Sequence, residues 1–328
     1  MRRMLALLLA LAACAWFAQT PAGAETYPVR TVRIVVPFPP GGGTDLTARI
    51  VAERLTKAFG QSFIIENRAG AASAIGIDYV AKARPDGYTL LWASSDGISV
   101  LPAVKSPLPY RIPESFEFVS SFSSYPVILA VASKLPIHSM QDFVAYAKAH
   151  PGQMHYSSSG AGGGGHLEPA YMATVLGLDM IHVPYDGAAP AAVAVAGGHV
   201  DFTDVAPSTV SPYIDAGTVR AIATSGRNRT ALYPDLPTVG ELGYPQLTED
   251  FYYGMYAPAG TPREIVKKLR DGVEAVLKDP TTPDRLHSLG LEPLDLDGPQ
   301  FRDFAVKDLK RWTDVAKAIN FRLAGGNE

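Results

Sequence analysis

The chain has 328 residues, which suggests about two domains of ordinary size. Of these residues 47% are hydrophobic and 19% charged, so compact cores are expected and a largely disordered chain is excluded. The formal net charge at pH 7 is only −3, and because no long basic run occurs, a nucleic-acid partner is not expected.

The first 24 residues contain the three parts of a secretory signal peptide. Arg2 and Arg3 form a basic start, residues 5–13 form an apolar run, and an Ala-Gly-Ala cleavage site ends at Ala24. We therefore expect an exported protein that works in the periplasm. Cys14 also fits a lipoprotein cleavage site, which is the alternative. After cleavage near Ala24 the chain would keep no cysteine, and so no disulfide and no thiol nucleophile.

Strands and helices are predicted to alternate from the start of the mature chain. Residues 31–37 form a β-branched apolar run typical of a buried strand, and a helix capped by Thr44 or Asp45 should extend to Phe59. The next elements are a strand at 63–66, a helix at 74–82 and a strand at 88–92. Strands that alternate with helices pair in parallel through right-handed crossovers, so the predicted fold class is α/β.

The same alternation continues in the second part of the chain. The expected elements are a strand-rich segment at 118–133, a helix at 140–149, strands at 154–158, 180–184, 200–205 and 219–224, and helices at 166–176 and 188–196. A connector at 227–244 is rich in turn residues. A strand at 251–257 and helices at 262–278 and 298–319 complete the chain.

Two strand-to-helix turns are rich in glycine, one near residue 40 and one near residue 160. Glycines allow a close approach of the backbone to a ligand, and a helix start offers free N–H groups and partial positive charge to an anion. Neither turn has the spacing of a P-loop or a dinucleotide-binding motif. We therefore expect an anion site at Phe38, Pro40, Gly41, Gly42, Gly43, Thr44 and Asp45, and a second at Ser158, Ser159, Gly162, Gly163, Gly164 and His166.

Simpler interpretations of these turns remain open. The carboxylate of Asp45 could itself take the free N–H groups, which would leave an ordinary strand-to-helix turn. The second turn could be a flexible surface loop, and His166 could be a helix-start residue that hydrogen-bonds to the backbone.

Two further strand ends carry polar residues. Ser94 and Ser95 follow the strand at 88–92, and Tyr185 and Ala188 follow the strand at 180–184. Ligands of open α/β sheets bind at the carboxyl ends of strands, so these residues could share one cleft with the glycine-rich turns. The seven histidines are scattered and no metal-site spacing is present, so neither a metal nor another cofactor is expected.

Short motifs occur in a fixed order over essentially the whole mature chain. They lie in Tyr27–Asp45, Glu66–Ala71, Pro85–Leu91, Ser158–Gly160, His182–Tyr185, Gly197–Asp201 and Ala257–Pro262. In this combination they closely resemble the Bug or TctC-like substrate-binding proteins of tripartite tricarboxylate transporters.

The resemblance implies a two-lobed type II periplasmic binding-protein fold, in which each lobe is a mainly parallel sheet flanked by helices and a two-strand hinge joins the lobes. Lobe 1 would comprise 25–126 plus 251–328, and lobe 2 would comprise 127–250. A small organic carboxylate would lie between the loops at 39–45 and 158–166. The implied partners are the large and small membrane subunits of a transporter, and we expect a monomer without enzymatic activity.

The chain departs from the family pattern at several positions near the implied cleft. Glycines stand at 163–165 where relatives usually carry Thr or Ser, and Asp186 replaces a usual Lys. Asp204 is shifted by one position, so it could face the other side of its strand, and Tyr252 replaces a common Trp. We include Asp204 and Tyr252 among the candidate ligand-binding residues. These differences suggest a ligand bulkier or less charged than citrate, such as an aromatic mono- or dicarboxylate.

Two other functions are considered. A secreted hydrolase could use a serine within 157–159 together with His166, although no third catalytic group can be identified from the sequence. A binding protein of this kind could also report to a signalling sensor instead of a transporter.

Overall fold

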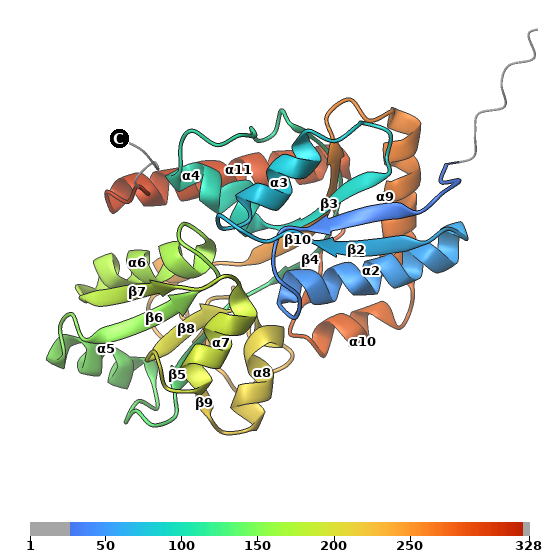
Figure 1. Ribbon diagram of the computed structural model, residues 1–328. Coiled ribbons are helices and arrows are strands. Elements are labelled where there is room, and N and C mark those ends of the chain that lie inside the picture. The colour runs from blue at the N-terminus through green and yellow to red at the C-terminus, as the bar shows by residue number, and fades with distance from the viewer. Residues whose placement is uncertain (1–26, 324–328) are drawn as a thin grey trace, which may run out of the picture.

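The computed structural model describes residues 27–323, which form two lobes, each built on its own sheet (Figure 1). The predicted α/β class and the two-lobed arrangement are confirmed. The predicted signal peptide at 1–24, with Cys14 and the cleavage site at Ala24, lies outside the described residues. Within residues 27–323, no helix is both long enough and apolar enough to cross a membrane.

The first lobe, at the upper right in Figure 1, contains a six-stranded sheet in the order β11-β4-β10-β3-β1-β2. Its strands are β1 (Val32–Val36), β2 (Phe63–Asn67), β3 (Thr89–Ser94), β4 (Phe116–Tyr125), β10 (Phe251–Pro258) and β11 (Glu292–Pro293). Its helices are α2 (Gly43–Phe59), α3 (Ala74–Ala81), the π-helical η1 (Asp96–Val100), α4 (Leu101–Val104), α9 (Arg263–Lys278), α10 (Thr282–His287) and α11 (Gly298–Ala318).

The second lobe contains a five-stranded sheet in the order β7-β6-β8-β5-β9. Its strands are β5 (Ile128–Ala132), β6 (Met154–Ser158), β7 (Met180–Pro184), β8 (Phe202–Val205) and β9 (Val219–Thr224). Its helices are α5 (Met140–Ala149), α6 (Gly164–Leu176), α7 (Ala188–Ala196), α8 (Pro207–Asp215) and the short η2 (Pro245–Leu247).

The prediction of mainly parallel sheets is wrong, because both sheets are mixed. β1 is parallel to β2 and β3, but β10 is antiparallel to β3 and β4, and β11 is antiparallel to β4. In the second sheet β6 is parallel to β7 and β8, whereas β5 is antiparallel to β8 and β9. Alternation of strands and helices predicts parallel pairing only for strands joined by a helix, and β4, β5, β9 and β10 adjoin the crossings between the lobes.

The described chain passes between the two sheets twice, at 126–127 and at 225–250. These two crossings contact each other, since Ser225 N donates to Val127 O at 3.0 Å and Val127 N donates to Ser225 Oγ at 3.0 Å. No strand spans the predicted boundaries at 126/127 and 250/251. The limits 25–126 plus 251–328 and 127–250 for the two lobes stay a prediction.

Helix α2 forms where expected but begins earlier than its predicted cap. It starts at Gly43 with Gly42 as N-cap, so the prediction that Thr44 or Asp45 would cap it is wrong. It ends at Gly60, whose φ of 66° suits a glycine. Buried residues of α2 pack on the sheet, and Trp92 Nε1 donates to Thr47 Oγ1 at 3.0 Å within this core.

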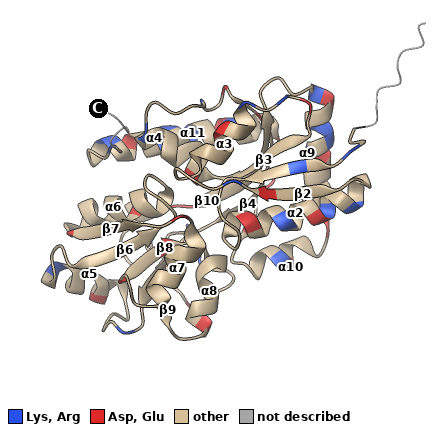
Figure 2. Cartoon of the chain, in the orientation of Figure 1, with Lys and Arg blue, Asp and Glu red and all other residues tan. Residues whose placement is uncertain are grey.

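Charged residues lie mainly on the outer elements of the first lobe. Figure 2 shows Lys and Arg on α2 and α9, whereas α6, α7 and α8 of the second lobe contain none. The helices that border the second lobe's side of the cleft therefore carry no cationic side chain.

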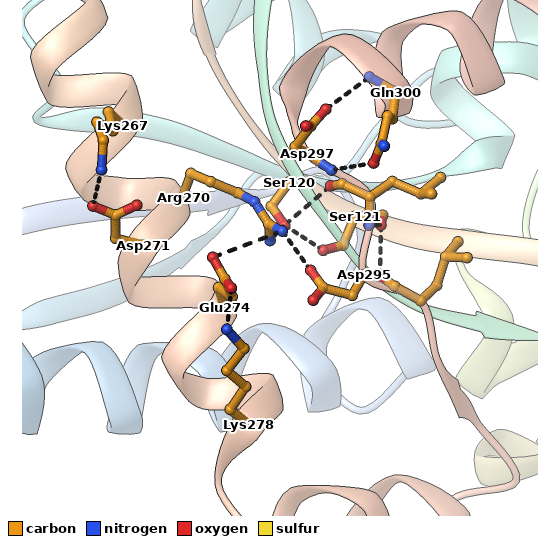
Figure 3. A network of polar contacts seen from close by, with 12 residues as sticks. Ser120, Ser121, Lys267, Arg270, Asp271, Glu274, Lys278, Asp295, Asp297 and Gln300 are labelled. Carbon is orange, nitrogen blue, oxygen red and sulfur yellow. Dashed lines mark hydrogen bonds and ion pairs between the residues drawn. The ribbon is translucent and has the colours of Figure 1, made fainter.

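Arg270 of α9 holds the strand β4 in place (Figure 3). Its Nη1 donates to Ser120 Oγ at 2.8 Å, and its Nη2 lies 2.6 Å from Asp295 Oδ1. Asp297 and Gln300 form a capping box at the start of α11 beside it. These contacts join α9 to the middle of β4, the strand that leads into the first crossing.

Candidate ligand-binding site

A cleft of about 570 Å³, open solvent at its mouth included, lies between the two lobes. The first lobe contributes the β1–α2 loop together with Asp96, Tyr125, Phe251 and Tyr253. The second lobe contributes the starts of α6, α7 and α8. The predicted site residues that line this cleft are Phe38, Pro40, Gly42, Gly43, Thr44, Ser159, Ala188 and Asp204.

The β1–α2 loop presents free amides to the cleft. Gly41 has a φ of +92°, and its N–H donates to Asp45 Oδ2 at 3.1 Å. Gly42 is an extended N-cap without a side-chain cap. In the described part of the chain no protein acceptor is found for the amides of Gly43 and Thr44, which as first-turn residues have no partner within the helix.

Asp45 shapes this loop from behind and does not line the cleft. Arg49 contacts both of its carboxylate oxygens at 2.9 Å, and Asn67 Nδ2 donates to Oδ1 at 3.0 Å. Burial alone would raise the pKa of Asp45, but the hydrogen bonds from Arg49, Asn67 and Gly41 hold this pKa below its ordinary value. The carboxylate thus takes the N–H of Gly41 and leaves the first-turn amides free.

The β6–α6 loop has the same backbone geometry but faces a different surface. Gly162 has a φ of +90°, and its N–H donates to His166 Nδ1 at 3.1 Å. Gly162, Gly163 and Gly164 do not line the cleft. A Cβ on Gly162 would lie 2.2 Å from Leu323 Cδ1 of the opposite lobe. Of this loop, only Ser159 and Gly165 reach the cleft wall.

Asp96 connects this second loop to the first lobe. Its Oδ1 accepts from Gly164 N at 2.6 Å, and its Oδ2 lies 3.4 Å from Ser94 Oγ. Burial raises the pKa of Asp96, while the hydrogen bonds from Gly164 and Ser94 act in the opposite direction. The Asp96 side chain is partly buried and borders the cleft.

His166 and His182 form a stacked pair, with ring centroids 3.5 Å apart. Burial and the neighbouring His182 lower the pKa of His166 to about 3, and burial lowers the pKa of His182 to about 4. Both rings are therefore neutral at neutral pH. His166 accordingly braces the loop as a hydrogen-bond acceptor and supplies no positive charge to an anion.

The arrangement expected for a hydrolase does not form. Ser158 is buried, and its Oγ lies 2.6 Å from Nε2 of His182, not of His166. Ser157 Oγ donates to Ala191 O at 3.0 Å. Within residues 27–323 no carboxylate hydrogen-bonds to either imidazole, so the third member of a catalytic triad is absent there.

The remaining predicted residues lie outside the cleft. Tyr185 lines an adjoining hollow at the mouth, beside Lys105 and Asp186. Ser94 and Ser95 are buried and do not line the cleft. Tyr252 is fully buried in the core, where its hydroxyl lies 2.6 Å from Ser99 Oγ, so its placement on the cleft is corrected.

The second acid of the cleft wall is Asp204, at the end of β8. It faces the cleft in spite of its shifted position in the sequence. Burial raises the pKa of Asp204 to about 7, although a hydrogen bond with Glu168 acts in the opposite direction. Glu168, on the first turns of α6, is also buried, and burial together with Asp204 raises its pKa well above the ordinary value. A proton on this pair of acids is favoured near neutral pH.

Comparison with known proteins identifies the family. The family model described as "Tripartite tricarboxylate transporter family receptor" matches residues 47–321. The chain belongs to the TctC family. The resemblance inferred from the sequence motifs is thereby confirmed, and members of this family are periplasmic solute-binding proteins.

Relatives of the TctC chain match it over nearly their whole length. BugT from Bordetella pertussis is 33% identical over 328 residues, which are 98% of this chain and 99% of BugT. A protein of R. palustris solved with adipate superposes with a TM-score of 0.87 at 34% identity, covering 90% of this chain and 99% of the other. MatC from Rhodopseudomonas palustris, solved with bound malate, gives a TM-score of 0.84 at 31% identity and covers 88% and 99%.

Several residues that line the cleft of this TctC receptor were not predicted from the sequence. Tyr253 takes the cleft position expected for Tyr252, because successive residues of a strand face opposite sides. Thr209 belongs to α8, a helix for which no prediction was made from the sequence and which contains Pro207 and Pro212. Pro207 occupies the first turn, where proline is favourable. Asp96 follows a predicted polar strand end, which was the one available signal.

Proposed function

We propose that this chain is the periplasmic receptor that captures a small organic carboxylate between its lobes and delivers it to the large and small membrane subunits of a tripartite transporter. One observation carries the proposal. The N-terminal ends of α2, α7 and α8 face a single cleft, which α6 borders only through Gly165, and the described residues that line it include no Lys, Arg or His. Helix starts attract anions through free amides and the helix dipole, so the backbone supplies the positive potential.

The carboxylate is best placed at the start of α2. The amides of Gly43 and Thr44 are available from the first lobe, and Thr209 borders the same cleft from the second. The hydroxyls of Thr209 and Ser208 are buried and without a hydrogen-bond partner among the described residues. A carboxylate in this position would satisfy donors from both lobes, which would stabilise the closed arrangement that the transporter recognises.

The character of the cleft supports a ligand less charged than citrate. Its walls include the stacked rings of Tyr125 and Tyr253, whose centroids are 4.4 Å apart, and the side chain of Phe38. Asp96 and Asp204 add acid groups to the wall. Two solved relatives hold the carboxylates adipate and malate, which supports a carboxylate ligand here. We propose that the receptor acts as a monomer and performs no catalysis.

A thermal-shift screen tests the proposal. Purified mature protein is screened with aliphatic and aromatic mono-, di- and tricarboxylates, and the methyl ester of each acid serves as its neutral control. We expect stabilisation by one class of acid and none by its ester. Native mass spectrometry of the protein from its own periplasm would then identify the bound solute. The proposal is wrong if no carboxylate stabilises the protein, and a response confined to tricarboxylates would contradict the less charged ligand.

A further inference from the structure

The two glycine-rich loops are structural copies of each other. Gly41 and Gly162 have φ values of +92° and +90°, and each donates its N–H to the side chain four residues later. The following N-caps, Gly42 and Gly163, have φ/ψ values of −84°/168° and −81°/174°. Neither has a side-chain cap. The sequence thus builds the same anion-binding helix start twice, once on each lobe.

The two copies differ in what occupies them. The first-turn amide of Gly43 has no protein acceptor among the described residues. The equivalent amide of Gly164 donates to Asp96 Oδ1 at 2.6 Å. Asp96 belongs to η1 of the opposite lobe. The first amide of α6 is therefore already bound to a carboxyl group, and that group is part of the protein.

Contacts to both of its oxygens hold the Asp96 side chain in this position. Its second oxygen lies 3.4 Å from Ser94 Oγ, so both carboxylate oxygens have a neighbouring donor. A Cβ on Gly164 would lie 2.7 Å from Asp96 Oδ1 and 2.3 Å from Phe251 Cε1. Only a glycine at 164 permits the observed approach between the lobes, so the loop sequence and Asp96 fit each other.

We propose that Asp96 occupies the position of a second ligand carboxylate and makes the receptor selective for monocarboxylates over dicarboxylates. The inference rests on the proposed function and specifies its substrate class. A ligand carboxylate at the start of α2 meets free amides, whereas a second one directed at the first amide of α6 would meet the Asp96 carboxyl group, which already accepts from Gly164 N at 2.6 Å. Asp204 is the only other ionisable acid among the described residues of the cleft wall, and no cation there offsets either acid.

Pairs of acids matched in length provide the test. Hexanoate is compared with adipate, and benzoate with terephthalate, by isothermal titration calorimetry on the full mature chain at constant pH and ionic strength. We expect the wild type to bind the better monocarboxylate at least about tenfold more tightly than its dicarboxylate partner, which equals about 1.4 kcal/mol. The wild-type comparison needs no variant, so a folding defect cannot obscure it.

Two substitutions assign the effect to Asp96. Asp96→Asn keeps an acceptor for Gly164 N but cannot ionise, and Asp96→Ser also opens space. Both should shrink or reverse the preference, whereas Asp186→Asn, which removes an exposed charge at the cleft mouth, should leave it unchanged. Circular dichroism confirms folding of each variant.

The possible outcomes separate the two proposals. A wild type that binds the dicarboxylates as well as or better than the monocarboxylates overturns the inference but leaves the carboxylate receptor intact. A preference that persists in Asp96→Asn and Asp96→Ser overturns the role of Asp96. If none of the four acids binds, while the thermal-shift screen also shows no carboxylate response, the proposed function itself fails.

Discussion

The β1–α2 and β6–α6 loops share one backbone design and differ in their side-chain surroundings. In the first, the residue that accepts the glycine N–H is a charged Asp45, held by Arg49 and Asn67. In the second it is a neutral His166, stacked on His182. The first helix start is open to the cleft, whereas the second is occupied by Asp96. The comparison teaches that a helix start becomes a ligand site only where the fold leaves its amides unpaired.

The largest effect is expected when a bulky side chain is placed in the open β1–α2 loop. A Cβ on Gly42 would lie 3.9 Å from Ala188 Cβ across the cleft, an ordinary contact, so Gly42→Ala should bind nearly normally. Gly42→Phe should weaken carboxylate binding by at least about a thousandfold, equal to about 4 kcal/mol, because its ring would occupy the ligand space. The φ of −84° at Gly42 suits any residue, so folding should persist. Calorimetry on both variants checks this, and unchanged affinity in Gly42→Phe would place the ligand elsewhere.

Asp204, the buried acid that contacts Glu168 of α6, provides a second test, in which the free energy of unfolding is measured as a function of pH. The pKa of Asp204 is about 7 in the folded chain against an ordinary 3.8, so folding favours its protonated form. Its contribution to stability is fully present below pH 3.8 and is lost as the pH rises to about 7. Relative to wild type, Asp204→Asn should therefore gain roughly 2–4 kcal/mol of stability across this window.

Urea unfolding of both proteins at several pH values measures this gain. Glu168, the partner of Asp204, is also buried and its pKa is also raised, with Glu249 and Arg311 facing it. Because Glu168 also takes up a proton on folding, Glu168→Gln should reduce the same slope of stability against pH. The exposed Asp215→Asn is the control and should leave the slope unchanged. A wild type and an Asp204→Asn variant with parallel pH profiles would show that Asp204 titrates normally.

Asp45 and His166, the side chains that accept the N–H of Gly41 and Gly162, can be compared through the stability that each contributes. Asp45→Ala leaves the N–H of Gly41 and the donors of Arg49 and Asn67 without their acceptor, and should cost about 2–3 kcal/mol of unfolding free energy. His166→Ala removes one neutral acceptor and should cost less from this hydrogen bond, about 1 kcal/mol. Urea denaturation at neutral pH gives both values. Equal costs would mean that charge does not distinguish the loops.

The smallest effect on binding is expected at Thr209 of α8, which borders the cleft opposite the β1–α2 loop. Thr209→Val keeps the side-chain shape but removes a hydroxyl that has no partner within the described residues. Carboxylate affinity should fall by about threefold to tenfold, close to 1 kcal/mol. Thr174→Val on the exposed face of α6 is the matched control. Tighter binding in Thr209→Val would show that this hydroxyl does not contact the ligand.

Local patterns in the sequence were enough to predict most of the strands and helices and the open β1–α2 loop, but not helices such as α8 and α10. Alternating strands and helices gave the α/β class, and the glycine-rich turn before Asp45 gave the cleft residues Phe38, Pro40, Gly42, Gly43 and Thr44, whereas Gly41 does not line the cleft. The direction of the strands next to the crossings could not be predicted, because no crossover helix constrains them. Tyr252 was chosen because it replaces a Trp that is common in relatives, and this comparison does not reveal which face of a strand lines the cleft.

The function of the second loop depended on contacts that the local sequence does not contain. Gly164 and Asp96 are far apart along the chain and meet only because the lobes close on each other. Gly162 is likewise covered by Leu323, which lies about 160 residues later in the chain. A glycine-rich helix start therefore indicates an anion site, but whether a solute or the protein fills it is decided by tertiary structure.

The neutral imidazole of His166 has a consequence for a receptor that works outside the cytoplasmic membrane, as proposed. Such a protein experiences the acidity of the medium. The pKa of His166 is lowered to about 3 and that of Asp45 lies below its ordinary 3.8, so neither brace changes its protonation as surroundings turn mildly acidic. The two glycine-rich loops should therefore keep their shape at mildly acidic pH. Acidification would instead change the protonation of the acids that line the cleft and of the solute itself.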